Sequence, residues 1–293
     1  MTVSEHTPIR FNLQATLTDR DHWLGLARRA ESEGFETLLV PDHPRSTASP
    51  FVALAAAASI TERIRLGTYV VNAGVWDPLS LATELATLDV VSEGRACFGV
   101  GAGHTPSEWT DRGMAYPSAP DRVDRMIEIV GAARRWLDDP GTPAPIQPSI
   151  PLLVGGNGRR VLSFAAAQAE IVGVTGLGVT LADGHSHAVE WAADQIDERL
   201  APLRRSEREL VVDALVQMVV VTDDRAAAAR ALADEHDLVA DDLLACPYAL
   251  IGSASEIASD LVAYRERWGI TRYTVRPPSM DAVGEIVRAL ARA

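Results

Sequence analysis

The chain has 293 residues, with 40 acidic and 27 basic side chains and a formal net charge of −13. This excess of negative charge argues against a nucleic-acid groove or a patch that binds an anionic membrane. No apolar stretch approaches the ~20 residues of a membrane span, and the polar start MTVSEHTPIR lacks the apolar centre of a signal peptide. We therefore expect a cytoplasmic protein that acts on a small molecule.

Short apolar strands alternate with helices along the whole chain. The first pair is a strand over Ile9–Ala15 and a helix over Asp19–Glu33, which ends at Gly34, where a glycine is favoured. The further predicted strands are Phe35–Val40, Ile64–Val71, Ala96–Val100, Ile150–Gly156, Ile171–Thr175, Leu210–Val221 and Arg272–Arg276. The further predicted helices are Pro50–Ile60, Pro78–Val91, Asp121–Leu137, Arg160–Ala169, His187–Leu200, Ser253–Trp268 and Asp281–Ala291.

About eight β-α units in a chain of this length predict a closed (β/α)8 TIM barrel, whose usual size is ~250 residues. We expect one domain over residues 1–293. The candidate linker is the proline-rich segment Asp138–Ser149, but strands of the same kind continue on both sides of it. We therefore interpret that segment as a surface loop.

The active site of such a barrel lies at the carboxyl ends of its strands, so residues just after each strand are the candidates. Asp42 and His43 follow the second strand in the sequence VPDHP. A histidine there can act as an acid or base near neutral pH, and a neighbouring carboxylate can orient or charge it. The same pair would also suit a loop without chemistry.

A glycine-rich turn, GVGAGH, follows the fourth strand at Gly99–His104. Alternating glycines let a flat ligand approach the backbone. The turn is not a dinucleotide-binding fingerprint, because Thr105 and Pro106 continue as loop where a helix would have to begin. His104 becomes a second titratable group at the same end of the barrel as His43.

The fifth strand runs into the sequence VGGNGRR. Gly155 and Gly156 precede a helix that begins near Asn157, an arrangement that favours phosphate or carboxylate binding by backbone N–H groups. Arg159 and Arg160 add positive charge. A turn that needs glycine for its geometry alone is the alternative.

Two tryptophans in loops, Trp76 and Trp109, are candidates for the wall of a substrate pocket over a flat ring, although either could equally anchor the surface. We expect no metal site. Cys97 and Cys246 have no metal-binding spacing, and His185 and His187 lack a carboxylate or cysteine partner. The segment 176–187 is interpreted as a substrate loop.

Four segments together resemble the bacterial luciferase-like family of flavin- and deazaflavin-dependent oxidoreductases. They are, in order, GFETLLVPDH, ITERIRLGTYVV, PLSLATELATLDVVSEGRACFGVGAG and IPLLVGGNG. The resemblance extends from the first predicted strand to the fifth and weakens afterwards. It implies a luciferase-like TIM barrel that holds a flat tricyclic cofactor against the third strand, with the cofactor phosphate near the fifth.

The resemblance also implies which residues contact the cofactor. In relatives, a non-proline cis peptide at the end of the third strand supports the ring, and Tyr69–Val70 is the matching peptide here. Gly155 and Gly156 match a turn whose backbone binds the phosphate diester. Ala102 and Gly103 match positions whose backbone contacts the ring and its side chain.

The function implied by the resemblance is hydride transfer between coenzyme F420 and a small organic substrate. Relatives that use F420 place a histidine beside the reacting face of the ring, and His43 matches it. In the sugar-phosphate dehydrogenases of the family a glutamate donates the proton where this chain has His104, and only Arg272 and Arg276 could match their substrate-phosphate site. We therefore do not expect a sugar phosphate, and His43 and His104 are the candidate catalytic groups.

Two alternatives remain open. One is an FMN-dependent monooxygenase that uses reduced flavin and oxygen, because both rings fit the same platform. The other is a barrel that binds a cofactor without turnover. Relatives are often dimers through helices of the first half of the barrel, so we expect a homodimer.

Overall fold

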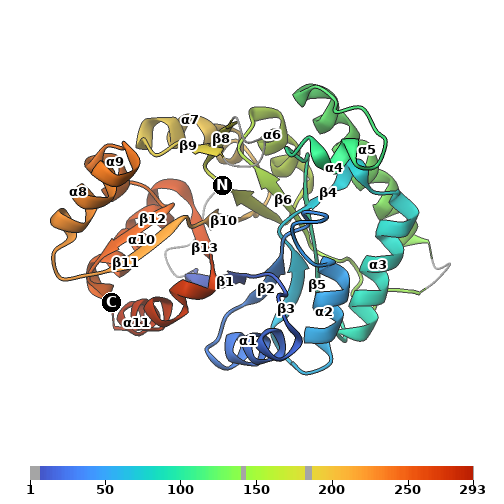
Figure 1. Ribbon diagram of the computed structural model, residues 1–293, viewed down its shortest axis with the longest axis horizontal. Helices are drawn as coiled ribbons and strands as arrows, with labels where there is room; N and C mark the ends of the chain where they lie inside the picture. The colour runs from blue at the N-terminus through green and yellow to red at the C-terminus, as the bar shows by residue number, and fades with distance from the viewer. Residues whose placement is uncertain (1–6, 140–142, 182–186, 293) are drawn as a thin grey trace.

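The structure is a computed structural model that describes residues 7–139, 143–181 and 187–292. Within these ranges, eight parallel strand positions form a closed barrel surrounded by helices (Figure 1). The strands are β1 (Arg10–Gln14), β2 (Thr37–Val40), β3 (Arg65–Thr68) with its continuation β4 (Val71–Asn72), β5 (Ala96–Gly101), β6 (Leu152–Gly156), β7 (Ile171–Val174), β10 (Val211–Leu215) and β13 (Ile270–Val275). Because β3 pairs with both β2 and β5, the sheet closes, and the predicted TIM barrel is confirmed.

Four of the helices around the barrel begin at polar residues whose side chains accept a free backbone N–H group. Asp19, Asp77, Ser118 and Ser253 each cap a helix in this way, and Ser253 forms a capping box with Glu256. The helices packed around the barrel are α1 (Arg20–Ser32), α2 (Pro50–Ala58), α3 (Pro78–Val91), α5 (Ala119–Asp138), α6 (Arg159–Gln168), α7 (Ala193–Arg204), α10 (Ala254–Trp268) and α11 (Met280–Leu290). Short turns of helix lie at η1 (Ala73–Val75), α4 (Ser107–Thr110) and η2 (Pro277–Ser279).

The closure between β3 and β5 depends on a glycine. A Cβ atom on Gly99 would overlap the carbonyl oxygen of Thr68, so no larger residue fits at this position. The two strands also share a side-chain hydrogen bond, in which Thr68 Oγ1 donates to the Gly99 carbonyl at 2.6 Å. At least one glycine of the sequence GVGAGH is therefore required by the packing of the barrel strands.

A buried carboxyl lies inside the barrel. Asp213 on β10 accepts hydrogen bonds from Asn12 Nδ2 on β1 at 2.6 Å and from Thr274 Oγ1 on β13 at 2.8 Å. Burial raises the pKa of Asp213 to about 7, although both hydrogen bonds oppose that rise. This polar group joins three neighbouring strands beneath the carboxyl end of the barrel.

The predicted strand Leu210–Val221 is wrong as one element. The chain leaves the barrel after Leu215, because the N–H of Gln217 donates to the Tyr248 carbonyl at 2.8 Å and turns the backbone away. A separate strand, β11 (Met218–Val221), then pairs in parallel with β12 (Ala249–Gly252) outside the barrel. The helices α8 (Arg225–His236) and α9 (Ala240–Leu244), together with β12, have no counterpart among the predicted elements.

The predicted helix His187–Leu200 begins too early. His187–Val189 is a strand, β9, that pairs antiparallel with β8 (Leu177–Thr180). The helix α7 begins at Ala193, after Glu190 has donated its N–H to the Gly176 carbonyl at 2.8 Å. The β8–β9 hairpin therefore extends from the carboxyl end of β7.

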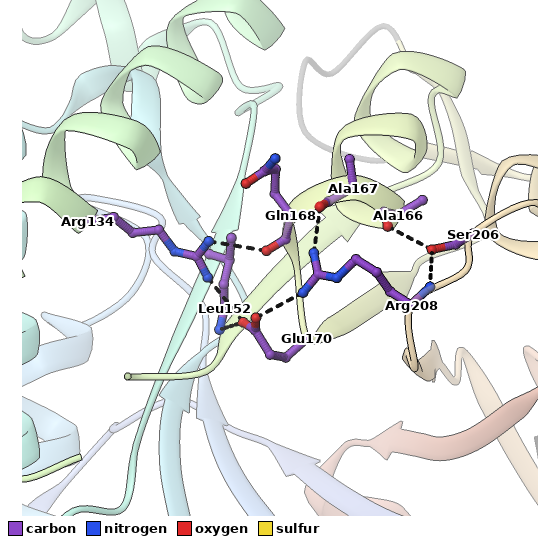
Figure 2. A network of polar contacts seen from close by, with 8 residues as sticks. All are labelled: Arg134, Leu152, Ala166, Ala167, Gln168, Glu170, Ser206 and Arg208. Atoms are coloured by element: carbon purple, nitrogen blue, oxygen red, sulfur yellow. Dashed lines mark hydrogen bonds and ion pairs between the residues drawn. The ribbon is translucent and has the colours of Figure 1, made fainter. Parts of the chain in front are cut away.

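The amino ends of the strands are held by charged side chains that bond to the backbone. Figure 2 shows one such network around Glu170, just before β7. Its carboxylate accepts from Leu152 N at 2.9 Å, from Arg134 Nη2 at 3.1 Å and from Arg208 Nη2 at 3.2 Å. The two arginines also donate to backbone carbonyls at the end of α6. The network thereby ties β6, β7, α5 and α6 together.

The proline-rich segment that was considered as a linker connects α5 to β6, which pairs directly with β5. Among the described helices, none combines the length and the apolar character needed to cross a membrane. Across the described residues, no group of three or more histidine, cysteine, aspartate or glutamate side chains is arranged to hold a metal ion. His185 lies outside the described residues.

Candidate active site

A cavity of about 590 Å³ opens at the carboxyl ends of the barrel strands. That volume and position are typical of a site for a cofactor or small ligand. All the residues predicted to be catalytic or cofactor-binding lie in its lining: Asp42, His43, Tyr69, Val70, Ala102, Gly103, His104, Gly155, Gly156 and Asn157. The fold therefore brings together residues that are more than 100 positions apart in the chain.

His43 is held by a buried glutamate. Its Nδ1 lies 2.6 Å from Glu108 Oε1, and Asn72 Nδ2 donates to the other oxygen, Oε2, at 2.8 Å. Burial alone would raise the pKa of Glu108, but the hydrogen bonds from His43 and Asn72 outweigh it and keep that pKa below its usual value. An ionised carboxylate can only accept, so the bond assigns a proton to Nδ1 of His43. Nε2 is then the nitrogen that accepts a proton.

Three histidine rings follow one another along the cavity. The ring centroids of His43 and His104 are 5.7 Å apart, and those of His104 and His187 are 4.3 Å apart, both with edge-to-face geometry. His43 follows β2, His104 follows β5, and His187 begins β9. The structure places His43 and His104 at one site, as the sequence predicts, and adds His187 beside them.

The cavity floor is formed around the peptide between Tyr69 and Val70, which is cis. The carbonyl of Tyr69 accepts a hydrogen bond from Gln14 Nε2 at 2.6 Å, and its N–H donates to the Val40 carbonyl. The phenol ring points into the barrel and fills the space left by Gly155 and Gly173, where a Cβ atom would clash with it. The backbone of residues 69 and 70 is therefore anchored beneath the cavity.

The turn after β6 offers backbone groups to an anion. The helix α6 begins after Gly158, which provides no side-chain cap for the first N–H groups of the helix. Asn157 is buried and donates to Glu190 Oε2 at 2.7 Å, and Glu190 is held in turn by Arg199. A cofactor phosphate fits this uncapped helix terminus, because free N–H groups and the helix dipole both favour an anion.

The glycines after β5 also serve the protein's own packing. A Cβ atom on Gly101 would clash with Val70, and one on Gly103, whose φ is +71°, would overlap the side chain of Asn72. The chain can therefore pass close to the residues that hold Glu108 and form the floor. Ala102, between these glycines, lines the cavity.

Neither predicted pocket tryptophan lines the cavity, and both predictions are corrected here. Trp76 donates from Nε1 to Asp42 Oδ2 at 2.8 Å and packs edge-to-face on Phe51. Trp109 is 1% exposed, and its ring fills the space beside Gly74. Both rings are large apolar side chains on loops that fold back onto the barrel, so they stabilise these loops from behind.

Asp42 lies between the cavity and Trp76. Burial raises the pKa of its carboxyl, while the hydrogen bond from Trp76 opposes the rise. Among the described residues, no hydrogen bond joins Asp42 to the His43 ring, whose carboxylate partner is Glu108. The orienting role that the sequence assigned to Asp42 therefore belongs to Glu108.

The two arginines of the last strand lie at opposite ends of the barrel. Arg272, near the amino end of β13, forms an ion pair with Glu36. Arg276, just after β13, lines the cavity, and its Nη1 donates to the Val216 carbonyl at 3.0 Å.

The sequence profile of luciferase-like monooxygenases matches residues 3–291. The chain belongs to the luciferase-like monooxygenase family. Described members of the family are oxidoreductases and monooxygenases. Its members bind F420 or FMN.

Relatives within the luciferase-like family include both F420-dependent enzymes and monooxygenases. An uncharacterized protein of Mycobacterium tuberculosis is 34% identical over 171 residues, which cover 45% of this chain and 59% of that relative, less than two thirds of its length. An F420-dependent glucose-6-phosphate dehydrogenase of Intrasporangium calvum is 26% identical over 220 residues, covering 67% of this chain and 64% of the dehydrogenase. A monooxygenase structure from Streptomyces bottropensis shares the fold, with a TM-score of 0.73, 21% identity and coverage of 97% and 98%.

Sequence reasoning missed several polar groups of this luciferase-like site. Glu108 lies on a four-residue helix, 65 positions from His43, and nothing in its neighbourhood marks it. Asn72 ends β4, two residues after the cis peptide, and Gln14 ends β1, so their places at strand ends were the available signal. His187 was predicted both as the last residue of a substrate loop and as the first of a helix, and the structure places it in the cavity lining, at the start of β9.

Proposed function

We propose that this protein is an F420-dependent oxidoreductase that transfers a hydride between the deazaflavin and a small organic substrate, with an alcohol and its carbonyl product as the first pair to test. The observation that carries the proposal is the hydrogen bond between His43 Nδ1 and the ionised Glu108 at the edge of the cavity. It supplies a positioned acid–base group beside the site for the ring.

The residues present fit a deazaflavin cofactor. The side chain of Val70 offers an apolar contact for a flat ring, and the uncapped amino end of α6 offers a phosphate site. When bound, the cofactor supplies the chemistry of two-electron hydride transfer, which the side chains of the cavity cannot provide.

The protein's own contribution to the reaction is proton transfer and orientation. In alcohol oxidation, His43 Nε2 takes the hydroxyl proton as the bond between carbon and hydrogen breaks. Glu108 stabilises the resulting imidazolium and holds the ring in place, while Asn72 holds Glu108. In the reverse direction the same nitrogen returns the proton to the carbonyl oxygen. His104 lies next to His43 and extends the polar edge of the site.

The test is a titration of the purified protein with coenzyme F420 and, in parallel, with FMN, followed by calorimetry. Selective F420 binding, followed by turnover with a panel of alcohols and carbonyl compounds, is the expected result. Selective FMN binding and oxygen consumption would replace the proposal by the monooxygenase alternative, which monooxygenase relatives support. F420 binding without turnover on any substrate would instead indicate a binding protein.

We also propose that the enzyme is a cytoplasmic homodimer. Four apolar residues on two consecutive helices are exposed: Val52 on α2 and Leu79, Val90 and Val91 on α3. Covering them in a dimer would remove this apolar surface from water. Light scattering at micromolar concentration should give twice the monomer mass of 31.4 kDa, and Val52→Asp should shift the population to monomer. A monomer at that concentration would contradict the proposal.

A further inference from the structure

The cavity contains a cation that the proposed proton transfer does not use. Among the lining residues that the structure describes, Arg276 is the sole lysine or arginine. It follows β13, whereas His43 follows β2 and the proposed phosphate turn follows β6. In the order of the barrel strands, β10 and β7 separate β13 from β6. Arg276 is therefore distinct from the phosphate site at the start of α6.

The contacts of Arg276 orient its guanidinium without neutralising it. Nη1 donates to the Val216 carbonyl at 3.0 Å and lies 3.4 Å from Gln217 Oε1. Within the described part of the chain, no carboxylate forms an ion pair with Arg276, and neither Nε nor Nη2 has a hydrogen-bond acceptor. The carbonyl oxygen of Val216 and the amide oxygen of Gln217 thus hold Nη1 of the guanidinium. Its other edge, formed by Nε and Nη2, keeps N–H donors for a ligand.

The two carboxylates in the same lining have donors of their own. Glu108 accepts from His43 and Asn72, and Asp42 accepts from Trp76. Desolvation by the cavity wall lowers the pKa of Arg276 from its usual value, but an arginine keeps its charge at neutral pH. The side chain is nonetheless exposed to solvent, so an anion in the cavity can reach the free edge of the guanidinium.

We propose that Arg276 binds an anionic group of the substrate, so that the natural substrate carries a carboxylate, a phosphate or a sulfonate in addition to the carbon that exchanges the hydride. The planar edge formed by Nε and Nη2 matches two oxygens of such a group. Gln217 serves as a positioning residue for the guanidinium. The part of this inference that concerns hydride transfer rests on the proposed function. The part that concerns the negative charge of the substrate rests on the open edge of the Arg276 guanidinium.

The binding test uses inorganic phosphate as the probe and does not require turnover. Calorimetry follows phosphate binding to the wild type, Arg276→Gln, Arg276→Lys and the control Arg20→Gln, an exposed arginine on α1. Each protein is measured alone and with saturating F420, which would displace phosphate from the α6 turn. We expect one phosphate to remain bound with F420 present. Its affinity should fall at least tenfold in Arg276→Gln, fall less in Arg276→Lys and stay unchanged in Arg20→Gln.

Three results would overturn the inference. One is equal phosphate affinity in the wild type and Arg276→Gln. Another is loss of all phosphate binding when F420 is added. The third is a variant that loses F420 affinity while its phosphate affinity is unchanged, because Arg276 would then hold the cofactor. If the wild type binds no F420, the proposed function fails, yet the comparison of Arg276→Gln with the wild type without cofactor still tests the anion site.

A kinetic comparison then identifies what the anion belongs to. A short hydroxy acid and its methyl ester are compared as substrates of the F420-loaded enzyme. The wild type should prefer the acid, and Arg276→Gln should lose at least tenfold of that preference through a higher KM for the acid. An equal preference for acid and ester in the wild type would contradict an anionic substrate.

Discussion

At the amino ends of the barrel strands, charged side chains are bonded to the backbone, whereas at the carboxyl ends they face a cavity. Arg95, just before β5, donates to the carbonyls of Ala58, Thr61, Ile64 and Ser92. Arg276, just after β13, makes one close contact with a carbonyl and leaves an edge open. The same residue type thus stabilises the fold at one end and can bind a ligand at the other.

This difference separates stability from function along the barrel axis. A group whose hydrogen bonds are all made within the protein contributes to folding, and its loss should lower stability without changing the chemistry. A group that retains donors or acceptors for a ligand should behave in the opposite way. Substitutions at the two ends should therefore affect stability at the amino end and turnover at the carboxyl end.

The largest effect is expected at the mouth, for His43→Ala. Removing a positioned acid–base group should lower kcat by about 10³-fold, roughly 4 kcal/mol of barrier, because these groups contribute about 10² to 10⁴-fold. The melting temperature should change little. Turnover with F420 and the best alcohol of the panel measures the effect, with the exposed His22→Ala as control. Unchanged turnover would remove His43 from the mechanism.

Asp213 lies inside the barrel beneath the cavity, between the stabilising groups at the amino end and the ligand-facing groups at the carboxyl end. Its substitution therefore tests to which of these two groups it belongs. Its pKa is about 7 in the folded protein and about 3.9 in an unfolded chain, so the folded state binds more protons between these values. Stability should therefore fall as the pH rises from about 4 to 7, by at most roughly 4 kcal/mol, and this contribution should stay lost at higher pH. Urea unfolding at pH 5 and pH 8 measures it.

The matched variant for this pH dependence is Asp213→Asn, which cannot ionise. It should flatten the profile and be more stable than the wild type at pH 8, while kcat stays within twofold. A rotation of the Asn12 amide can supply the acceptor that the new amide needs, since Asn12 Oδ1 has no partner among the described residues. Asp281→Asn, on the surface, should leave the wild-type profile intact. A profile that persists in Asp213→Asn would show that another group is responsible.

Asp89, near the amino end of β5, tests the stability side of the comparison. This fully buried carboxylate accepts hydrogen bonds from Ala96 N, Ile146 N and Gln147 N. Asp89→Ala would leave several buried donors without a partner and should cost about 3 kcal/mol of unfolding free energy. F420 affinity should not change. Denaturant unfolding and calorimetry provide the two measurements.

The control for Asp89 lies on the same helix. Asp77 caps the start of α3, is exposed and accepts the Ser80 N–H at 2.8 Å. Asp77→Ala should cost about 1 kcal/mol, the usual contribution of such a cap. If the two substitutions cost the same, the buried position of Asp89 would not be what gives the amino end its stability.

The sequence predicts the first half of the barrel well because local signals agree there. Each strand is a short apolar run, and caps such as Asp77 or glycines such as Gly94 mark the helix ends. The run Leu210–Val221 misleads because both β10 and β11 are apolar. Only the distant carbonyl of Tyr248 decides that the chain turns at Gln217.

The residues of the candidate site could likewise be predicted where a local signal marks them, and not where a distant contact decides their role. Residues at or just after the end of a strand, such as Gly155, His43 and His104, could be placed at the mouth from the order of the elements alone. Glu108 could not, because its role depends on a hydrogen bond across 65 residues. Trp109 was misplaced for the related reason that a loop aromatic can turn toward the ligand or toward the barrel, and packing beside Gly74 decides which.

The smaller of the two expected effects on turnover is that of Glu108→Gln. This substitution tests a carboxylate at the mouth whose two oxygens both accept hydrogen bonds within the protein, as the carboxylates at the amino end do. The amide can still accept from His43 Nδ1, and Asn72 can turn its amide to match, so the fold should be kept. The charge that stabilises the imidazolium is lost, however. We expect kcat to fall about 30-fold, roughly 2 kcal/mol.

A double-mutant cycle separates this positioning role from general damage to the site. In a His43→Ala background, Glu108→Gln should have no further effect on kcat, because the group on which Glu108 acts is absent. A further loss of comparable size would mean that Glu108 acts on substrate or cofactor by itself. A large drop in melting temperature for the single variant would place Glu108 with the stabilising groups of the amino end, and the contrast between the two ends would then fail at this residue.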